Sequence, residues 1–556
     1  MTTRAQYLDP QAADIENFTD SMYDRARNGS DATLDSAAMS ATNADLITSD
    51  NLPTEIAETI ALMPEAERTR VLDAIVYGAD VFNREHGFMP TADLIQAALQ
   101  QGRSAAHRFD AAGRHMLDSV GTAGSTDHHD QISSQPNRIV VAITSAIAEA
   151  IPFATYLPTD IGSNEARLGI VSHQAGSQFG DYVVGELMDG INVGKPYISS
   201  ERRVILTKAG DLLSATGKIT GRTGGSENTP LLRGRTIVYV NGFPVAFESH
   251  NTASSAANSP ISGTVNISGT DYAISGTVTV ATGAVALAFA PALPNANVVV
   301  EVEGFIDFEV APELAPRVIT QVQTYRLFAN PWRVLADQTI DSKTQYQNEL
   351  SLDLQSENLI AIRNQFGMER HYMTLAKLKA LAVSNQRTYD FDWTGQKSDK
   401  TRARIWQDFI AVLGIADQVM AEDTMDHGIT HLYVTKTLMA QFMTLPTDIF
   451  VPSGITARPS IFRVGTLFKK FEVYYTPKGL TEGGGSAQML CIGRSPQVAR
   501  CPVVLGDAVA PTYLPLAMGN DMKTRSAFYA RNFTSVNPHQ PSARGAALIT
   551  VTNLGM

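Results

Sequence analysis

The residues that could do chemistry most directly are Asp127-His-His-Asp130, the densest cluster of potential metal ligands in the sequence. Carboxylates and imidazoles hold divalent metals in enzymes that hydrolyse phosphate esters, where strand ends bring further carboxylates to the same point. Here the four residues end a stretch rich in Gly, Ser and Thr that begins at Gly121, a composition typical of a linker. We therefore expect a solvated segment, and the sequence predicts no metal-binding and no catalytic residue.

The segment from Gly210 to Lys218 has the composition of a phosphate-binding loop but the wrong spacing. Six residues separate Gly210 from Gly217, and Ile219 stands where a Ser or Thr would be required. The sequence also lacks a GxSxG elbow, an HExxH pair, an EF-hand loop and a dinucleotide-binding fingerprint. It therefore predicts no cofactor-binding residue and no enzyme.

Nothing in the sequence marks an oxidising compartment or a membrane. Its two cysteines, Cys491 and Cys501, are too few for a disulfide framework and are predicted to be buried thiols near one another. The first residues are polar throughout, unlike a secretory signal peptide. The longest apolar run, residues 139–151, is interrupted by polar side chains and is too short to span a bilayer. We expect a protein that is made in the cytoplasm and has no membrane partner.

The net charge of the chain lies entirely in its first 130 residues. They contain nine arginines, no lysine and 21 acidic residues, whereas the remaining 426 residues carry 35 basic and 35 acidic side chains. The basic clusters of the body, Glu201-Arg-Arg203 and Lys469-Lys470, are short and do not indicate a nucleic-acid-binding surface. This asymmetry predicts an acidic, self-repelling leader joined to a neutral body that can pack against copies of itself.

The leader is predicted to be helical and flexibly attached. Apolar residues recur at helical spacing over 54–84, with an interruption at Pro64, and again from Thr91 toward Leu117. The Gly- and Ser-rich linker follows at 121–130.

The body mixes strands and helices without repeated βαβ units. Glycines and strand-like pieces over 165–218 indicate a long hairpin-type excursion, and short β-rich runs over 236–310 are typical of a small β-sandwich. Apolar spacing over 339–383 predicts a long helix, with a bend at Gly367, before strands and helices alternate. The predicted fold class is α+β.

Short motifs in the C-terminal third resemble the major capsid proteins of T-even-type contractile phages. They are Val473-Tyr-Tyr-Thr-Pro477, Cys491-Ile-Gly493, Ala510-Pro-Thr-Tyr-Leu-Pro-Leu516 and Lys523-Thr-Arg525. The order of parts along about 400 residues is similar to the HK97-like capsid fold of tailed bacteriophages. In that family a helical leader, an N-terminal arm, an extended loop, a spine helix and an axial domain follow one another.

The resemblance implies a division of the chain into seven parts. These are the acidic leader (1–130), the N-terminal arm (131–164), the extended loop (165–235), an inserted β-rich domain (236–310), a peripheral domain with the spine helix (311–388), the axial domain (389–502) and a C-terminal return to the peripheral domain (503–556). Family leaders are often removed by a maturation protease, and Ile56-Ala-Glu58 and Ile147-Ala-Glu149 match its loose apolar-x-Glu pattern.

The implied function is a self-assembling shell subunit located in the virion. Its partners would be copies of itself in hexamers and pentamers, a portal, decoration proteins, a maturation protease and packaged double-stranded DNA in non-specific proximity. The extended loop would contact a neighbouring subunit through Tyr182, Val183, Val184, Arg202 and Arg203. The alternative from another class is a tail-sheath or tail-tube protein, which would also self-assemble but gives no reason for an acidic leader.

Overall fold

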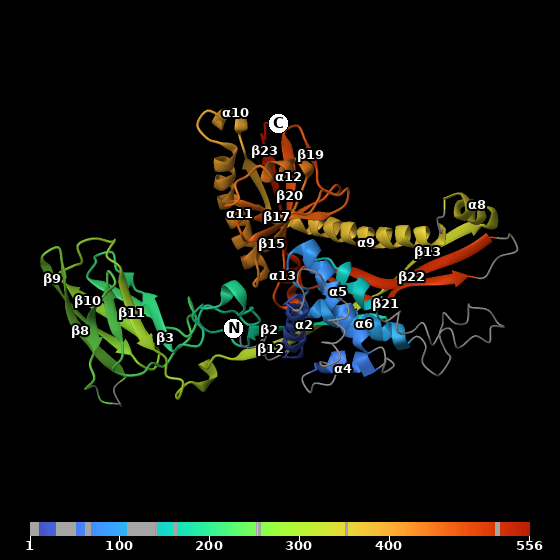
Figure 1. Cartoon of the computed structure of the whole chain (residues 1–556). Coiled ribbons are helices and arrows are strands. Elements are labelled where there is room, and N and C mark those ends of the chain that lie inside the picture. Colours follow the sequence, from blue (N-terminus) through green and yellow to red (C-terminus); the bar gives the residue numbers. More distant parts are fainter. Residues whose placement is uncertain are drawn as a thin grey trace. The chain divides into compact units, whose positions relative to one another are not determined.

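The computed structural model describes residues 10–28, 52–61, 68–107, 140, 142–159, 164–251, 253, 257–350, 354–516 and 523–555. It divides into two compact units (Figure 1). The first unit is formed by Met1–Ile170 and Thr324–Met556, and the second by Val171–Gln323. Helices and strands are mixed without a repeated βαβ order, which confirms the predicted α+β class.

The leader forms helices in the first unit, each where apolar residues recur at helical spacing. Helix α5 buries Val71, Ile75 and Phe82 on one stripe. It ends at Gly87, whose left-handed φ of 79° lets its N–H donate to the Asn83 carbonyl at 2.7 Å. The helices are α2 (Pro10–Asn28), α4 (Thr54–Ala61), α5 (Thr69–His86) and α6 (Ala92–His107). The predicted continuation toward Leu117 and the linker at 121–130 lie outside the described residues.

The segments predicted for the peripheral domain, together with one short strand of the arm, form a long four-stranded sheet and a long helix. Among the described strands the order is β1-β21-β22-β13, with β1 parallel to β21 and the other pairs antiparallel. The strands are β1 (Thr155–Tyr156), β13 (Asn330–Thr339), β21 (Val503–Leu516) and β22 (Lys523–Val536). The long helix is α9 (Leu354–Leu381), preceded by α8 (Ile340–Leu350) and followed by η5 (Ala382–Ser384). Its 28 residues span about 42 Å and run through Gly367 without interruption.

An eight-stranded sheet forms the second core of this unit. In the described chain its order is β14-β23-β20-β15-β18-β17-β16, with β19 paired to β20. Its strands are β14 (Gln386–Asp390), β15 (Ile429–Val434), β16 (Phe450–Pro452), β17 (Phe462–Leu467), β18 (Phe471–Tyr475), β19 (Glu482–Gly483), β20 (Ser486–Gly493) and β23 (Ala546–Thr552). Its helices are α10 (Trp393–Gln396), α11 (Arg402–Thr424), α12 (Lys436–Phe442), η6 (Val498–Arg500) and α13 (Gln540–Ala543). Trp406 and Phe409 of α11 and Phe442 of α12 are buried with this sheet in one apolar cluster.

The second unit is a sheet that closes on itself. Nine described strands follow the order β3-β11-β6-β7-β8-β9-β10-β5-β4. Strand β3 pairs with β11, and strand β4 pairs with β5. Only one residue separates β3 from β4 along the chain, so the two ends of the strand order are joined. The strands are β3 (Glu201–Ile205), β4 (Thr207–Lys208), β5 (Ser214–Lys218), β6 (Ile237–Val240), β7 (Phe243–Glu248), β8 (Asn258–Ile267), β9 (Thr270–Thr279), β10 (Ala284–Ala290) and β11 (Val300–Phe305). The short helices η3 (Gly190–Asn192) and η4 (Pro312–Leu314) complete this unit.

A five-residue segment that occurs twice in the sequence forms two neighbouring strands of this sheet. The two Ile-Ser-Gly-Thr-Val segments lie in β8 and β9, which pair antiparallel around Ser268-Gly269. Both turn residues have positive φ, as a two-residue turn between twisted strands requires. Two long strands, β2 (Glu165–Ala175) and β12 (Val318–Phe328), pair with each other, and each crosses one sequence boundary of this unit.

Two of the predicted boundaries are wrong. The limit at 235/236 falls inside the nine-stranded sheet, because β3, β4 and β5 pair with strands from the predicted insertion. The C-terminal segment 503–556 does not return whole to the peripheral region, because β23 pairs with β20 and β14 in the eight-stranded sheet. In both places strands distant in sequence share a sheet, which the local pattern could not indicate.

Candidate assembly interface

Of the two sequence motifs that could have carried chemistry, one lies outside the described residues and the other ends in a strand. Asp127-His-His-Asp130 lies outside them. Within the described ranges no group of three or more His, Cys, Asp and Glu side chains could hold a metal ion. Residues 214–218 of the failed phosphate-loop pattern form strand β5, and the Lys218 ammonium donates to the Ser226 carbonyl at 2.7 Å.

Both cysteines are free thiols in the protein interior, as predicted. Cys491 is packed in the apolar cluster of the eight-stranded sheet. The Cys501 thiol donates to the Ser495 carbonyl at 3.6 Å. Burial raises the pKa of both thiols, so both are protonated and unreactive at neutral pH.

Two of the five predicted contact residues have their side chains inside the second unit. Tyr182 is 2% exposed, its ring lies 5.1 Å from that of Tyr197, and its hydroxyl donates to the Asn192 carbonyl. Arg202 is 6% exposed and stacks over Phe179 with 4.3 Å between guanidinium carbon and ring centroid. Its guanidinium also donates to backbone carbonyls, including that of Gly221 at 3.0 Å. Both side chains therefore hold the loop together from within.

The other three predicted contact residues are exposed. Val183 and Val184 are 57% and 61% exposed. Arg203 pairs with Glu301 at 2.7 Å and lies over the Tyr239 ring on the outer face of the sheet. The same loop exposes further aliphatic side chains that the sequence analysis did not single out, namely Ile191, Val193 and Ile198.

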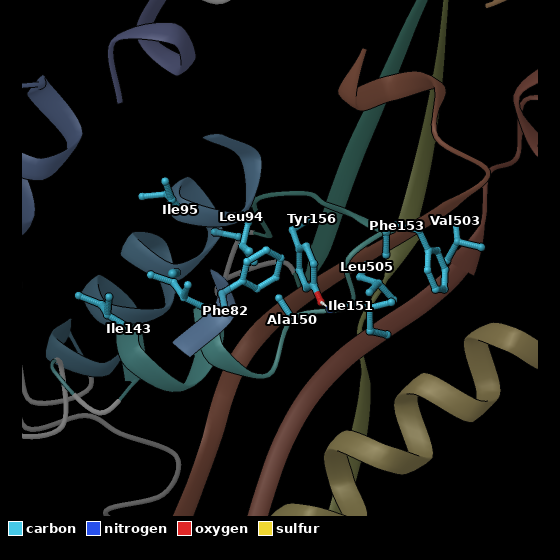
Figure 2. Close-up of a cluster of buried hydrophobic side chains, with 14 of the residues drawn as sticks. Phe82, Leu94, Ile95, Ile143, Ala150, Ile151, Phe153, Tyr156, Val503 and Leu505 are labelled. Atoms are coloured by element: carbon cyan, nitrogen blue, oxygen red, sulfur yellow. Dashed lines mark hydrogen bonds between the residues drawn. The ribbon is translucent and has the colours of Figure 1, made fainter. Parts of the chain in front are cut away.

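Within the first unit, buried apolar side chains pack the described leader helices against the body, so the leader is docked and not loosely attached as predicted. Phe82, Leu94 and Ile95 of the leader belong to one buried apolar cluster with the arm and with β21 (Figure 2). The arm contributes residues 143–156, including Phe153 and Tyr156. Gly78 allows the close approach of the arm, because a Cβ there would lie 3.0 Å from the Ile147 Cβ. The docked leader is thus part of the core.

A buried ion pair fixes the position of the leader on the body. The Asp93 carboxylate of α6 pairs with Arg494 at 3.1 Å, and their side chains are 5% and 16% exposed. Asp93 also accepts the Tyr156 N–H at 3.2 Å, and Arg494 donates to the Pro152 carbonyl at 2.5 Å. Charged groups this far from water are stable only when paired in this way.

A second polar contact lies on β21. The Asp507 carboxylate pairs with Arg370 of α9 at 3.0 Å and accepts the Gln101 amide N–H of α6 at 2.8 Å. Arg370 and Asp507 are 13% and 4% exposed. The buried Asp507 carboxylate therefore connects strand β21 with helix α9 and with helix α6 of the leader.

Three buried histidines pack against aromatic residues of the eight-stranded sheet and of the arm. His86 of α5 lies 3.1 Å from the Tyr474 hydroxyl, and His371 of α9 lies 3.0 Å from the Tyr433 hydroxyl. His431 of β15 packs at the edge of the Phe153 ring, with 6.1 Å between the ring centroids. Burial lowers the pKa of all three imidazoles to about 3. They are therefore neutral polar members of the core at pH 7.

Sequence reasoning missed this interface because its partners are far apart in the chain. Asp93 and Arg494 are 401 positions apart. The available signal was the set of apolar residues in the leader helices, which needs a partner surface to cover it. A buried carboxylate and a buried arginine are not distinguishable in sequence from solvated ones.

No helix in the described residues is long and apolar enough to cross a membrane.

Solved structures with a distant similarity to this chain include two phage capsids and an encapsulin. The capsid of jumbo bacteriophage PhiKZ matches 73% of this chain and 93% of its own, with 10% identity and a TM-score of 0.36. The capsid of Ralstonia phage GP4 matches 42% of this chain and 76% of its own, with 9% identity and a TM-score of 0.31. The SrpI encapsulin complex from Synechococcus elongatus matches 43% and 78%, with 10% identity and a TM-score of 0.26. No protein-family model and no curated protein matches the chain.

Proposed function

We propose that this chain is the major capsid protein of a tailed bacteriophage and that its copies assemble into the icosahedral shell around the genome. The observation that carries the proposal is the order of parts along the described chain. Leader helices are followed by the arm, by the long strands β2 and β12 with the nine-stranded sheet between them in sequence, by α9 and by an eight-stranded sheet. This is the order of the HK97-like capsid fold that the sequence resembles. The proposed role is structural, with no reaction to catalyse.

The surface supports self-association. The loop of the second unit exposes the aliphatic residues Val183, Val184, Ile191, Val193 and Ile198. Further large apolar side chains are exposed on β12 and β13, among them Val322 and Leu335 at 60% and 67%. Because the body carries 35 basic and 35 acidic residues, copies would approach without long-range repulsion.

The leader would act as a fused scaffold during assembly. It is docked on its own body by a buried core, yet Tyr77 of α5 remains 56% exposed. An exposed aromatic on a helix is suited to contacts between leaders of neighbouring copies. The excess acidic charge of crowded leaders would repel DNA over about 8–10 Å at physiological salt.

The remaining partners follow from the proposed role. A portal would replace one pentamer, decoration proteins would bind the outer surface, and a maturation protease would act on the leader. Double-stranded DNA would be enclosed by the shell.

Electron microscopy of the purified full chain under assembly conditions tests the proposal. We expect closed shells built from hexamers and pentamers. Open tubes would favour the tail-sheath or tail-tube alternative. A chain that stays monomeric at high concentration in every buffer would overturn self-assembly as its function.

The scaffold role is tested without disturbing the core by Tyr77→Ser. We expect fewer and more irregular shells from this variant, with unchanged circular dichroism of the subunit. Tyr77→Phe, which keeps the apolar ring, is the matched control and should assemble normally. Deleting 1–130 would be less informative, because it also uncovers buried residues such as Leu378 and Leu505. Normal shells from Tyr77→Ser would contradict a leader contact at this residue.

A further inference from the structure

Three arginines of the body converge on one short segment of the leader. This leader segment runs from Glu85, at the end of α5, to Asp93, at the start of α6. Arg494 pairs with Asp93 at 3.1 Å, and Arg458 pairs with Glu85 at 3.1 Å. Arg463 lies against the turn between the helices, because a Cβ on Gly87 would be 2.4 Å from its Nη1 atom.

The leader segment presents negative charge to each of these arginines. Arg458 and Arg494 have their ion pairs, in the described part of the chain, with leader carboxylates. Arg463 keeps a partner within the body, Glu472 at 2.5 Å, and lies beside the carboxyl-terminal end of α5, where the helix dipole is negative. Without the leader segment, Arg458 and Arg494 would lose their carboxylate partners. Arg494 would keep its hydrogen bond to the Pro152 carbonyl, and Arg463 would keep Glu472.

Guanidinium groups recognise carboxylates and phosphates through the same planar arrangement of N–H donors. The arginines come from three separate places in the body: the segment before β17, β17 itself, and the residue that follows β20. A surface assembled in this way from distant segments can bind any anion of suitable spacing.

We propose that this arginine surface, defined as Arg458, Arg463 and Arg494, binds the phosphodiester backbone of duplex DNA when the leader segment is unseated. The proposal rests on the proposed function, because it requires a shell that encloses DNA. The leader carboxylates Glu85 and Asp93 then stand where phosphates would lie, and the leader and DNA compete for the same guanidinium groups. The acidic leader therefore delays contact between the body and the genome.

The test uses the full-length chain, a labelled 20-base-pair duplex of arbitrary sequence and fluorescence anisotropy at 50 and 200 mM salt. Glu85→Gln with Asp93→Asn removes the two leader carboxylates. We expect this double variant to bind the duplex about tenfold more tightly than the unaltered chain at 50 mM salt, a gain of about 1.4 kcal/mol. Three phosphate contacts give a salt slope of about −2.7, so its affinity should fall about 40-fold between the two salt concentrations.

Arg458→Gln with Arg494→Gln, added to the double variant, should abolish the gain. One remaining contact lowers the slope to about −0.9, a loss of only about 3–4-fold over the same salt range. Arg458→Lys with Arg494→Lys preserves the charge and should restore most of the binding. Lys400→Gln with Arg544→Gln is the matched control, since these basic residues are also paired with carboxylates but lie elsewhere.

Hydrogen exchange of residues 69–107 in the same samples reports whether the leader is seated. We expect faster exchange in the double variant, and also in the unaltered chain when duplex is added at low salt. DNA binding with unchanged exchange, an unseated leader without a gain in DNA binding, or a leader that stays seated without its two carboxylates would each overturn the proposal. Shells seen by electron microscopy in these samples would leave the proposed function standing even then.

Discussion

Acidification should destabilise the first unit through the three buried histidines. His86, His371 and His431 are packed with Tyr433, Tyr474, Phe88 and Phe153 on one face of the eight-stranded sheet. The cations nearest to them are Arg463, beside His86, and Arg494, beside His431, and both oppose a positive charge on the rings. The main cause of all three pKa shifts is burial, which disfavours the protonated rings.

The sign and size of the effect follow from linkage. Burial lowers the pKa of each histidine from 6.5 to about 3 in the folded chain. Below pH 6.5 the unfolded chain therefore binds protons that the folded chain excludes, and stability falls as the pH falls toward 3. Between pH 7 and pH 5 each histidine lowers the free energy of unfolding by about 2 kcal/mol, and all three by about 6 kcal/mol. This is comparable with the whole stability of a typical domain, about 5–15 kcal/mol.

The assay is hydrogen exchange of the β15 and α9 amides at pH 7, 6 and 5, corrected for the intrinsic pH dependence of exchange. His431→Phe keeps an aromatic ring between Phe153 and Tyr474 and removes one of the three titrating groups. Its loss of protection should shrink to about 4 kcal/mol. His250→Gln, an exposed histidine of the second unit, is the control and should leave the loss unchanged. An equal loss in His431→Phe and the unaltered chain, or no loss in either, would refute the reasoning.

Three further outcomes are expected. Asp93→Asn should destabilise the first unit by about 3–5 kcal/mol in urea denaturation, because it leaves a buried arginine unpaired. Glu58→Gln, in an exposed ion pair, should cost less than about 1 kcal/mol. Equal effects of the two substitutions would contradict the importance of burial. Arg370→Gln should also cost about 3–5 kcal/mol and lower the thermal midpoint, and a change below 1 kcal/mol would show that its carboxylate partner is solvated in solution. Val183→Ser with Val184→Ser should slow shell formation in light scattering while changing subunit stability by less than about 1 kcal/mol, and unaltered assembly would exclude these residues from the contact.

The sequence predicts local structure correctly where that structure depends on the spacing of nearby residues. The apolar spacing over 54–84, interrupted at Pro64, predicts helices where the structure has α4 and α5. The glycines at 483–485 predict a hairpin turn, which the structure confirms between β19 and β20. Both features depend on a few neighbouring residues and on the dihedral angles that they allow. The repeated Ile-Ser-Gly-Thr-Val segments at 261–265 and 274–278 likewise predict two similar strands, and these strands pair with each other.

By itself the sequence determined the α+β class, the acidic leader and neutral body, the main helices, and the resemblance to capsid proteins. Only the tertiary structure decided that the leader is docked, that Tyr182 and Arg202 support the loop from inside, and that the strand following β3 closes the nine-stranded sheet. The reason is physical: periodicity records which face of an element is apolar, but not which distant surface covers it. The position of a buried pair such as Asp93 and Arg494 depends on contacts between segments about 400 residues apart, and these form only when the whole unit folds.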